Sequence, residues 1–442
     1  MAKGIPKFIT AFYWQLRGKL YKPSQRAKKP IVIAAAYIWR RLLFRTTFIA
    51  ITGSTGKTTT KEFLANILEK KYSVMRTPGN WNHRTFLGPE MTILKARPWH
   101  RFVVMELGIE VPGDMASVAR FVKPHIALML DIKLCHTNVF KTLEAIAAEK
   151  SQLLHYVQES GAVILNQDNA YIAEMPIKKG VEVLRFGESP SADLHVTRLE
   201  SRWPERLSLD FEYDGQTYPV ATRLVGNHWK PTVMAAIAAA LYCGVAMPRI
   251  LQAVEQIDVF WARLQPVVLP GFGGATVLRD DWNGSIDTFE PALKVLADAK
   301  ANRKIAVFSD YSDSRKKRRR RANHLGRVAA EHVDIAIFVG DYADFSKNAA
   351  VGAGLSEEKA HAFFTVAEAT AFLKTLLQSG DLVLIKGQAN HHLSRIYLGL
   401  LGDVKCTLPS CSRQILCDRC PQLGFSWHPE FKPYMAPPES QV

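Results

Sequence analysis

Short apolar runs recur along this chain, and a stretch with helical periodicity follows each of them. In the first half of the chain they lie at 46–52, 101–107, 126–132 and 161–167. Runs that are apolar throughout are typical of strands buried on both faces, as in parallel sheets covered by helices. The alternation therefore predicts an α/β fold with a doubly wound parallel sheet.

A second set of apolar runs begins beyond residue 265, at 275–280, 304–310, 335–341 and 381–387. A chain of 442 residues is also too long for one ordinary core. We therefore expect a central α/β domain over 48–264 and a smaller, Rossmann-like α/β domain over 265–404. A basic segment, 1–47, precedes them, and a cysteine-containing tail, 405–442, follows.

Positive charge is the unusual part of the composition. The chain has 57 Lys and Arg against 41 Asp and Glu, which gives a formal net charge of +16. Residues 1–50 contain eleven Lys or Arg and no acidic residue, and 314–321 reads SRKKRRRR. Such charge favours an anionic partner, whether lipid, nucleic acid or a phosphorylated substrate. The sequence has no dedicated nucleic-acid motif, which disfavours that partner.

The basic segment carries apolar residues at helical spacing: Phe8, Phe12, Leu16 and Leu20. This pattern suits an amphipathic helix on an anionic membrane surface, and equally a helix packed on the globular body. The apolar run at 31–39 is too short to span a bilayer, and no signal-peptide cleavage site follows it. We expect a cytoplasmic protein, with peripheral contact at the inner face of the membrane as the further option.

Residues 51–64, ITGSTGKTTTKEFL, join the first strand to a helix through a Gly-rich turn. Such a turn lets the backbone approach an anion, and the helix N-terminus directs unpaired N–H groups at it. Lys57 can reach terminal phosphates, and the Thr58 hydroxyl can bind Mg²⁺. The predicted nucleotide site comprises Gly53, Ser54, Thr55, Gly56, Lys57, Thr58 and Thr59.

Further segments follow this turn in order: TPGNWN at 77–82, MELGIEVPGDM at 105–115, LCHTNVFKTLEAIAAEK at 134–150, LNQDN at 165–169, ARL at 262–264, RDDWNGSID at 279–287 and LVLIKG at 382–387. Together with the shortened phosphate turn, this series resembles the Mur ligase family, which joins a carboxylate to an amine using ATP. The resemblance covers about 48–390. It implies an ADP-forming acid–amino-acid ligase that acts through an acyl phosphate, in cell-wall or related peptide biosynthesis.

The resemblance also implies ATP, Mg²⁺ and a set of site residues. It assigns the metal to Thr58, Glu106, His136 and Lys150, with Lys150 modified by CO₂ to a carbamate. Lys57, Lys150, His136 and Arg263 would act in catalysis. A carboxylate and hydroxyl suit Mg²⁺, whereas a His is not a preferred ligand, so that role rests on the family alone. Without the resemblance, Lys150 would read as a solvated residue of a predicted helix.

Residues of the second domain take further roles by the same resemblance. Arg263 matches a residue that reaches the ATP phosphates, and Asp280 and Asn283 match the nucleotide-binding segment. Asp310 and His324 would lie on loops that face the incoming amine, and Lys386 would follow the last core strand as a third substrate residue. An Asp at a strand end is, alternatively, often a cap or turn residue.

The sequence departs from the family in four places. At one of them Gln388 follows Lys386 and Gly387 where the relatives carry Ser, which bears on the amine site. The phosphate turn begins at residue 53, which leaves no room for the family's domain for a UDP-linked substrate, so we expect small-molecule acid and amine substrates that are acidic or lipid-linked. Trp229 replaces an Asn near the adenine and would stack on the base or be a buried aromatic. The run 315–321 replaces an acidic loop, and either grips an anionic acceptor or is merely solvated.

A different class of function stays open at this point. A catalytically degenerate ATP-binding protein could hold anionic lipid or nucleic acid through the basic segments. The joint presence of Glu106, His136 and Lys150 favours catalysis, because a protein that only binds has no use for a metal cluster.

Four cysteines fall in the tail with the spacing C-x4-C-x5-C-x2-C: Cys406, Cys411, Cys417 and Cys420. Four thiolates suit a closed tetrahedral zinc site of structural character. Reduced free thiols are the alternative, since disulfides are unusual in an ATP-using cytoplasmic protein.

Overall fold

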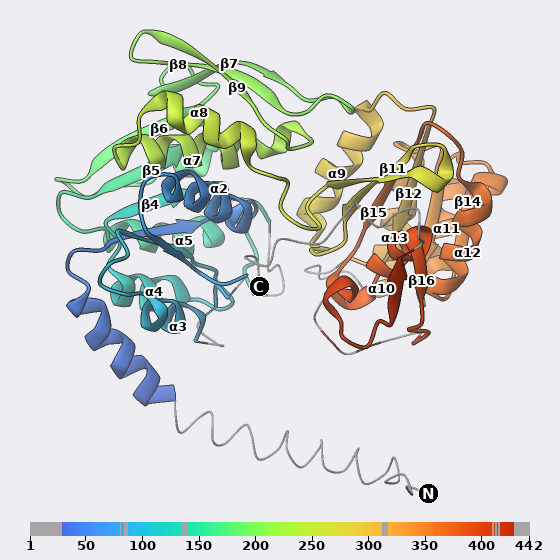
Figure 1. The fold of residues 1–442 in the computed structure, drawn as a ribbon, viewed down its shortest axis with the longest axis horizontal. Helices are drawn as coiled ribbons and strands as arrows, with labels where there is room; N and C mark the ends of the chain where they lie inside the picture. Colours follow the sequence, from blue (N-terminus) through green and yellow to red (C-terminus); the bar gives the residue numbers. More distant parts are fainter. Residues whose placement is uncertain are drawn as a thin grey trace, which may run out of the picture.

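The computed structural model describes residues 29–79, 81–83, 87–134, 139–311, 317–408, 411, 413 and 416–427. Figure 1 shows two α/β bodies side by side, the first built on strands β1 to β9 and the second on β10 to β15. Both sheets are mainly parallel, which confirms the predicted α/β class.

The first sheet has the strand order β2-β3-β1-β4-β5-β6-β7-β8-β9. Its strands are β1 (Thr47–Thr52), β2 (Val74–Arg76), β3 (Phe102–Glu106), β4 (Ile126–Met129), β5 (Ala162–Asn166), β6 (Glu182–Gly187), β7 (Leu194–Glu200), β8 (Ser208–Tyr213) and β9 (Gln216–Ala221). The strands from β2 to β7 pair in parallel, and β7, β8 and β9 form an antiparallel extension. The predicted apolar runs correspond to β1, β3, β4 and β5. The extension is half exposed, so it carries no continuous apolar signal.

Helices cover both faces of this sheet: α2 (Lys57–Glu69), α3 (Gly88–Lys95), α4 (Asp114–Val122), α5 (Leu143–His155), α6 (Ala170–Ala173), α7 (Lys230–Tyr242) and α8 (Met247–Gln256). One apolar core packs α2, α7 and α8 on one face, and a second packs α4 and α5 on the other. Helix α7 is almost wholly buried, which its continuously apolar sequence explains.

The second sheet has the order β10-β11-β15-β12-β13-β14. Its strands are β10 (Gln265–Leu269), β11 (Ala275–Asp280), β12 (Arg303–Phe308), β13 (Ile335–Val339), β14 (Ala360–Phe363) and β15 (Asp381–Lys386), with only the β10–β11 pair antiparallel. The helices are α9 (Ile286–Asp298), α10 (Arg318–Ala330), α11 (Ala343–Gly352), α12 (Val366–Leu376) and α13 (Ser394–Leu401). In the tail, β16 (Gly402–Val404) pairs with β17 (Phe425–Trp427).

A helix over 29–42 precedes the first sheet. Its inner face is anchored by Arg40, whose Nε and Nη2 donate to Val122 O at 2.6 Å and Lys123 O at 2.8 Å. Ala36 of the same helix is fully buried in the apolar core that also contains α4 and α5. The predicted amphipathic positions at 8–20 lie outside the described residues. Within the described part of the chain, no helix is long and apolar enough to cross a membrane.

Candidate active site

The phosphate turn lies at the carboxyl end of β1, between β1 and α2. A Cβ on Gly53 would lie 2.9 Å from Leu130 Cβ, and Gly56 has a φ of 77° with Thr232 Oγ1 at 3.0 Å from such a Cβ. Both positions therefore require glycine. Gly56 is also the residue before α2 and offers no side-chain cap, so the first N–H groups of the helix point at the cleft without a capping partner.

The side chains of the turn divide between holding the loop and facing the cleft. Thr55 donates through its N–H and its hydroxyl to the carboxylate of Asp131, at 2.8 and 2.5 Å. Ser54 Oγ hydrogen-bonds the backbone of Lys133 in both directions, at 2.9 Å. Lys57 Nζ curls back over the turn and donates to Gly53 O at 2.8 Å and Ser54 O at 3.1 Å. The ammonium thus lies where a phosphate on this turn would need a counter-charge.

Glu106 ends β3 and is 1% exposed. Its Oε1 accepts a hydrogen bond of 2.5 Å from Asn82 Nδ2. Its Oε2 has no hydrogen-bond partner among the described residues and lies 4.0 Å from Nζ of Lys61, which is fully buried. Lys61 is itself engaged by the backbone oxygens of Thr77 and Gly79. A buried carboxylate oxygen in this state is suited to a hard cation.

Lys150 lies on α5, where its side chain is 1% exposed and Nζ donates to Gly53 O at 2.9 Å. The alternative of a solvated helix face is therefore wrong: the helix turns this residue inward, beneath the phosphate turn. His136, which the resemblance places with it, lies outside the described residues.

A cleft of about 290 Å³ lies between the two bodies. From the first body it is lined by residues 54–59, Asn82, Glu106, Lys133, His228 and Trp229, and from the second by Arg263, Asp280, Trp282, Asn283, Ser285, Asp287, Thr288 and Pro291. The structure thus brings most of the expected nucleotide residues to one place. Gly53 and Lys150 lie behind this wall, in contact with each other.

The wall formed by the second body depends on a buried ion pair. Lys386 Nζ lies 2.9 Å from Asp280 Oδ2 and donates to Asn283 O at 2.6 Å, and its side chain is fully buried. Burial lowers the pKa of Lys386, and the charge of Asp280 opposes this effect. Burial likewise lowers the pKa of Arg263, again opposed by Asp280. Lys386 is the last residue of β15 rather than the residue after it, and it holds the cleft wall in shape.

His228 and Trp229 lie at the cleft, in a 3-10 turn (Asn227–Trp229) that directly precedes α7. Burial, with smaller effects from Lys133 and Lys386, lowers the pKa of His228 to about 3, so its ring is neutral at physiological pH. Trp229 is 8% exposed, and its Nε1 has no hydrogen-bond partner among the described residues. The indole N–H of Trp229 could therefore donate to a ligand in the cleft that carries a hydrogen-bond acceptor.

A second cavity, of about 730 Å³, opens at the carboxyl ends of β12 and β13. Asp310 lines it and is engaged by Arg321 in a two-point ion pair. Arg318 and His391 also line it, and His391 Nδ1 lies 2.8 Å from Ser309 Oγ. The basic run does not end as a loop: residues 318–321 form the first turn of α10.

His324 also lies on α10 rather than on a loop. Its ring packs edge-on against Tyr311, with 6.2 Å between the ring centroids, and it does not line the second cavity. Asp310 therefore lines the second cavity together with Arg318 and Arg321 of the basic run, whereas His324 does not line it.

The cysteines of the tail gather around a small cavity. Cys406, Cys411, Cys417 and Cys420 line a space of about 20 Å³ together with His392. Cys417 Sγ lies 3.3 Å from His392 Nδ1, and burial raises the pKa of this thiol to about 11. The five described cysteines form no disulfide. Within the described residues, no three His, Cys, Asp or Glu side chains are already arranged as ligands around one ion.

Sequence reasoning missed three residues that shape the site: Asn82, Lys61 and Asp131. Asn82 lies in the TPGNWN segment, so its place in an Asn-rich loop was a usable signal. Lys61 looks like an ordinary charged residue of a helix, and Asp131 like a strand-end polar residue. Only tertiary contacts show that both are engaged in the site: Lys61 with Thr77 O and Glu106, and Asp131 with Thr55 of the turn.

Comparison with known proteins identifies the class. Residues 51–240 match the Mur ligase middle domain, and residues 262–389 match the Mur ligase glutamate ligase domain. The chain belongs to the Mur ligase family and is an ATP-dependent, ADP-forming ligase that makes amide bonds.

Particular relatives narrow the comparison. The chain is 27% identical over 381 residues to the UDP-N-acetylmuramoyl-tripeptide–D-alanyl-D-alanine ligase of Mycobacterium tuberculosis, covering 81% of this chain and 74% of that enzyme. The enzyme of the same name from Synechocystis is 29% identical over 375 residues, covering 83% and 76%. A crystal structure of MurF from Acinetobacter baumannii superposes with a TM-score of 0.76 at 28% identity, covering 84% and 80%. MurF from Thermotoga maritima, solved with ADP, shares the fold with a TM-score of 0.72 at 21% identity, covering 84% and 83%.

Proposed function

We propose that this enzyme joins the carboxylate of a muramoyl-type peptide, or of a related acidic or lipid-linked acid, to the amine of a short peptide in peptidoglycan synthesis. The observation that carries the proposal is the cleft in which the phosphate turn and Glu106 of the first body face Arg263 and Asp280 of the second. The names of the relatives support the substrate class. We also propose that it works in the cytoplasm, as a ligase of cytoplasmic precursors would.

In the proposed reaction, a carboxylate oxygen of the acid attacks the γ-phosphorus of ATP, and ADP leaves. The nitrogen of the amine then attacks the acyl carbon, phosphate leaves with its electron pair, and the amine loses a proton. Lys57 and Arg263 face the phosphates from opposite walls and reduce the repulsion between two anions. Groups on both walls of the cleft would orient the reactants.

The residues present fit Mg²⁺. The Oε2 atom of Glu106 lacks a hydrogen-bond partner within the described structure, and Thr58 lines the same cleft with its hydroxyl-bearing side chain. Both supply hard oxygen atoms. When bound, Mg²⁺ neutralises charge on the terminal phosphates. Lys61 Nζ lies 4.0 Å from the same Oε2 atom and places a buried positive charge beside the carboxylate.

The experiment that tests this function is ADP release by the purified protein with ATP, Mg²⁺ and bicarbonate. A panel of acids and amines would include UDP-N-acetylmuramoyl-tripeptide with D-Ala-D-Ala, and the products would be identified by mass. We expect turnover with a peptidoglycan-type acid. ATP binding without turnover on any pair would instead favour a degenerate, purely binding protein.

We further propose that Lys150 carries a carbamate, formed when its amine nitrogen attacks CO₂ and loses a proton. Its buried place against Gly53 O supports this, because the group would lie beside the phosphate turn and away from bulk water. We expect turnover to fall at least about tenfold in CO₂-free buffer and to return with bicarbonate, in line with the usual loss of a positioned charge. Lys150→Ala should be inactive with or without bicarbonate. Full activity of wild-type enzyme in CO₂-free buffer would contradict the carbamate.

The helix over 29–42 supports a proposal of peripheral contact with an anionic membrane. Ile31, Ile38 and Leu42 form one stripe on its outer face and are 69%, 60% and 57% exposed. The inner face is already packed on the body, so this stripe needs another partner. Arg41 of the same helix and Arg45 of the turn after it are exposed and would complement anionic headgroups.

We expect the full chain to co-sediment with phosphatidylglycerol vesicles and much less with phosphatidylcholine vesicles. The triple variant Ile31→Asn, Ile38→Asn, Leu42→Asn should lower binding at least about tenfold, because three apolar side chains no longer enter the lipid. Val268→Asn, an exposed apolar residue of the second body, is the control and should bind as wild type does. Equal binding by the triple variant would place any lipid contact elsewhere.

For the tail we propose one structural Zn²⁺ held by the four cysteines. The cavity they share has room for a single ion, and four soft ligands suit zinc. We expect about one zinc per purified chain by elemental analysis, and far less in Cys417→Ser and Cys420→Ser. Cys243→Ser, which removes a thiol outside the tail, should keep the metal. A metal-free wild-type protein, expressed with zinc supplied, would show that the thiols are simply reduced.

A further inference from the structure

The segment that connects the two bodies is strained. Ala262 has a φ of 53° and Leu264 a φ of 51°, a left-handed conformation that side chains with a Cβ rarely adopt. Arg263 lies between them and lines the nucleotide cleft. Backbone of this kind persists only where its surroundings hold it in place. The contacts of this connecting segment, residues 261–264, therefore decide where Arg263 points.

The tail supplies several of those contacts. The guanidinium carbon of Arg419 lies 4.0 Å from the ring centroid of Trp261, and that of Arg279 lies 5.4 Å away. Leu416 forms a small apolar cluster with Trp261 and Ala262. The cleft side of the connecting segment thus carries Arg263, while the tail covers Trp261 and Ala262.

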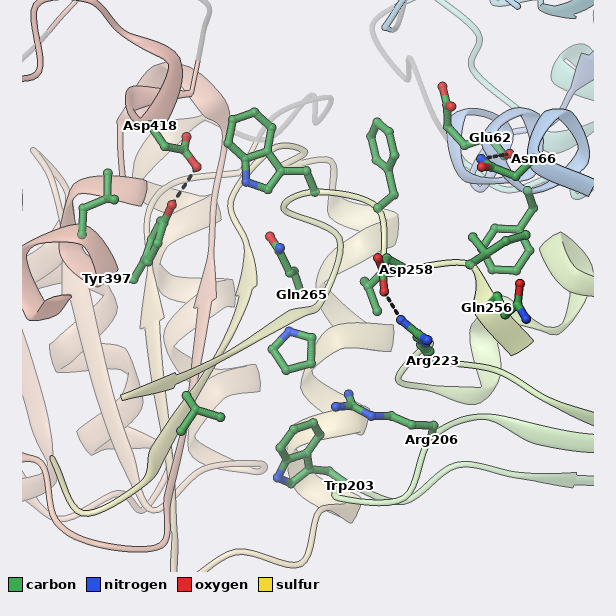
Figure 2. Close-up of a pocket in the computed structure, with 18 of the residues that line it drawn as sticks. Glu62, Asn66, Trp203, Arg206, Arg223, Gln256, Asp258, Gln265, Tyr397 and Asp418 are labelled. Atoms are coloured by element: carbon green, nitrogen blue, oxygen red, sulfur yellow. Dashed lines mark hydrogen bonds and ion pairs between the residues drawn. The ribbon is translucent and has the colours of Figure 1, made fainter. Parts of the chain in front are cut away.

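Of the covering residues, Leu416 directly precedes Cys417, and Arg419 lies in the turn between Cys417 and Cys420. Asp418 anchors this turn, since its Oδ2 accepts from Arg279 Nη1 and from the Tyr397 hydroxyl, each at 2.7 Å. Arg279 is fully buried and pairs with Asp281 at 3.1 Å. Figure 2 shows Asp418 and Tyr397 joined on one side of a groove of about 1270 Å³ between the two bodies. Arg223 and Asp258 lie on the other side of the same groove.

Arg279, which binds Asp418, also lies next to a residue of the nucleotide cleft at the end of β11. Arg279 and Asp281 flank Asp280, which faces the cleft and pairs with Lys386. One turn of the tail therefore contacts both the connecting segment that carries Arg263 and the strand end that carries Asp280. The tail therefore does more than cover the edge of the second sheet, because it contacts Trp261 and Arg279, which are neighbours of cleft residues.

We propose that residues 416–419 act as a brace that positions Arg263 for the phosphates of ATP. The inference rests on the proposed nucleotide cleft, and the zinc proposed for Cys417 and Cys420 would hold the brace rigid. Without the brace, the strained connecting segment can relax, and Arg263 spends less time facing the cleft. Arg419 and Asp418 are positioning residues, since they contact the segment and its anchor and not the nucleotide.

The test is the affinity of the full chain for ATP with Mg²⁺, measured by calorimetry, which needs no knowledge of the acid or amine. We expect Arg419→Ala to weaken ATP binding about fivefold to tenfold, as loss of a partly desolvated cation–aromatic contact would. Arg419→Lys, which keeps a cation over Trp261, should recover most of the affinity. Asp418→Asn should weaken binding in the same way. Arg419 is exposed, so its variants should fold normally.

Arg223→Ala is the matched control, because Arg223 lines the same groove and pairs with Asp258 but lies away from the brace. It should bind ATP as wild type does. Unchanged affinity in Arg419→Ala, or an equal loss in Arg223→Ala, would overturn the brace. Wild-type protein that failed to bind ATP would instead overturn the proposed nucleotide cleft. A loss in Arg419→Ala but none in Cys417→Ser would support the brace and remove the need for zinc in it.

Discussion

Lys57→Ala should lower kcat/KM for ATP by about a hundredfold to a thousandfold, the usual cost of removing one preorganised charge from a phosphoryl-transfer site. The ammonium lies over the phosphate turn, held by Gly53 O and Ser54 O, in the cleft between the two bodies. Lys150 Nζ also contacts the turn, at Gly53 O, but it does not line the cleft. Steady-state ADP release at varied ATP would measure the effect.

Lys70→Ala is the matched control for this prediction. Lys70 directly follows α2 but is exposed and lies outside the cleft, so its loss should change kcat/KM by less than about twofold. If Lys57→Ala kept wild-type turnover, the phosphate turn would not carry the reaction. Loss of turnover in Lys70→Ala would instead indicate a general effect of charge.

Lys386→Met should destabilise the second body by about 3–5 kcal/mol, because it leaves the Asp280 carboxylate buried without its partner. The side chain of Lys386 is fully buried, and that of Asp280 is 9% exposed. The hydrogen bond to Asn283 O is lost as well. Denaturant unfolding of the full chain would show the transition of this body at lower urea.

Two further variants distinguish the effect of leaving a buried charge unpaired from the effect of removing a lysine side chain. Lys386→Met combined with Asp280→Leu should regain much of the stability, since no charge is then stranded, although the cleft should bind ATP poorly. Lys300→Met breaks an exposed pair with Glu205, both 56% exposed, and should leave the unfolding transition almost unchanged. A small loss in Lys386→Met would mean that water or another group compensates Asp280.

Much of the fold follows from sequence alone because buried parallel strands are locally recognisable. The runs at 46–52, 275–280 and 381–387 are apolar on both faces, and each became a central strand. The antiparallel extension β7–β9 was not predicted, since its strands are buried on one face only and read as mixed segments. Residues 318–321 were treated as part of a loop because four successive arginines hide the first turn of α10.

The nucleotide residues were also predictable to a large extent. Gly53, Gly56 and Lys57 belong to one contiguous turn, whose chemistry depends on local backbone geometry. Asp280 and Arg263 were found only through the order of motifs, since nothing local shows that they meet the turn across a cleft.

By itself, then, the sequence determined the strand–turn–helix and the parallel sheets, because these depend on local periodicity and on a contiguous motif. It indicated the class of reaction through the ordered series of motifs that resembles the family. Tertiary structure alone decided that Lys150 and Lys61 are buried, that Lys386 pairs with Asp280, and that the tail packs on Trp261. Each of these features depends on a contact between residues that are far apart in the sequence. A charged side chain reads as solvated until packing removes it from water and supplies a partner.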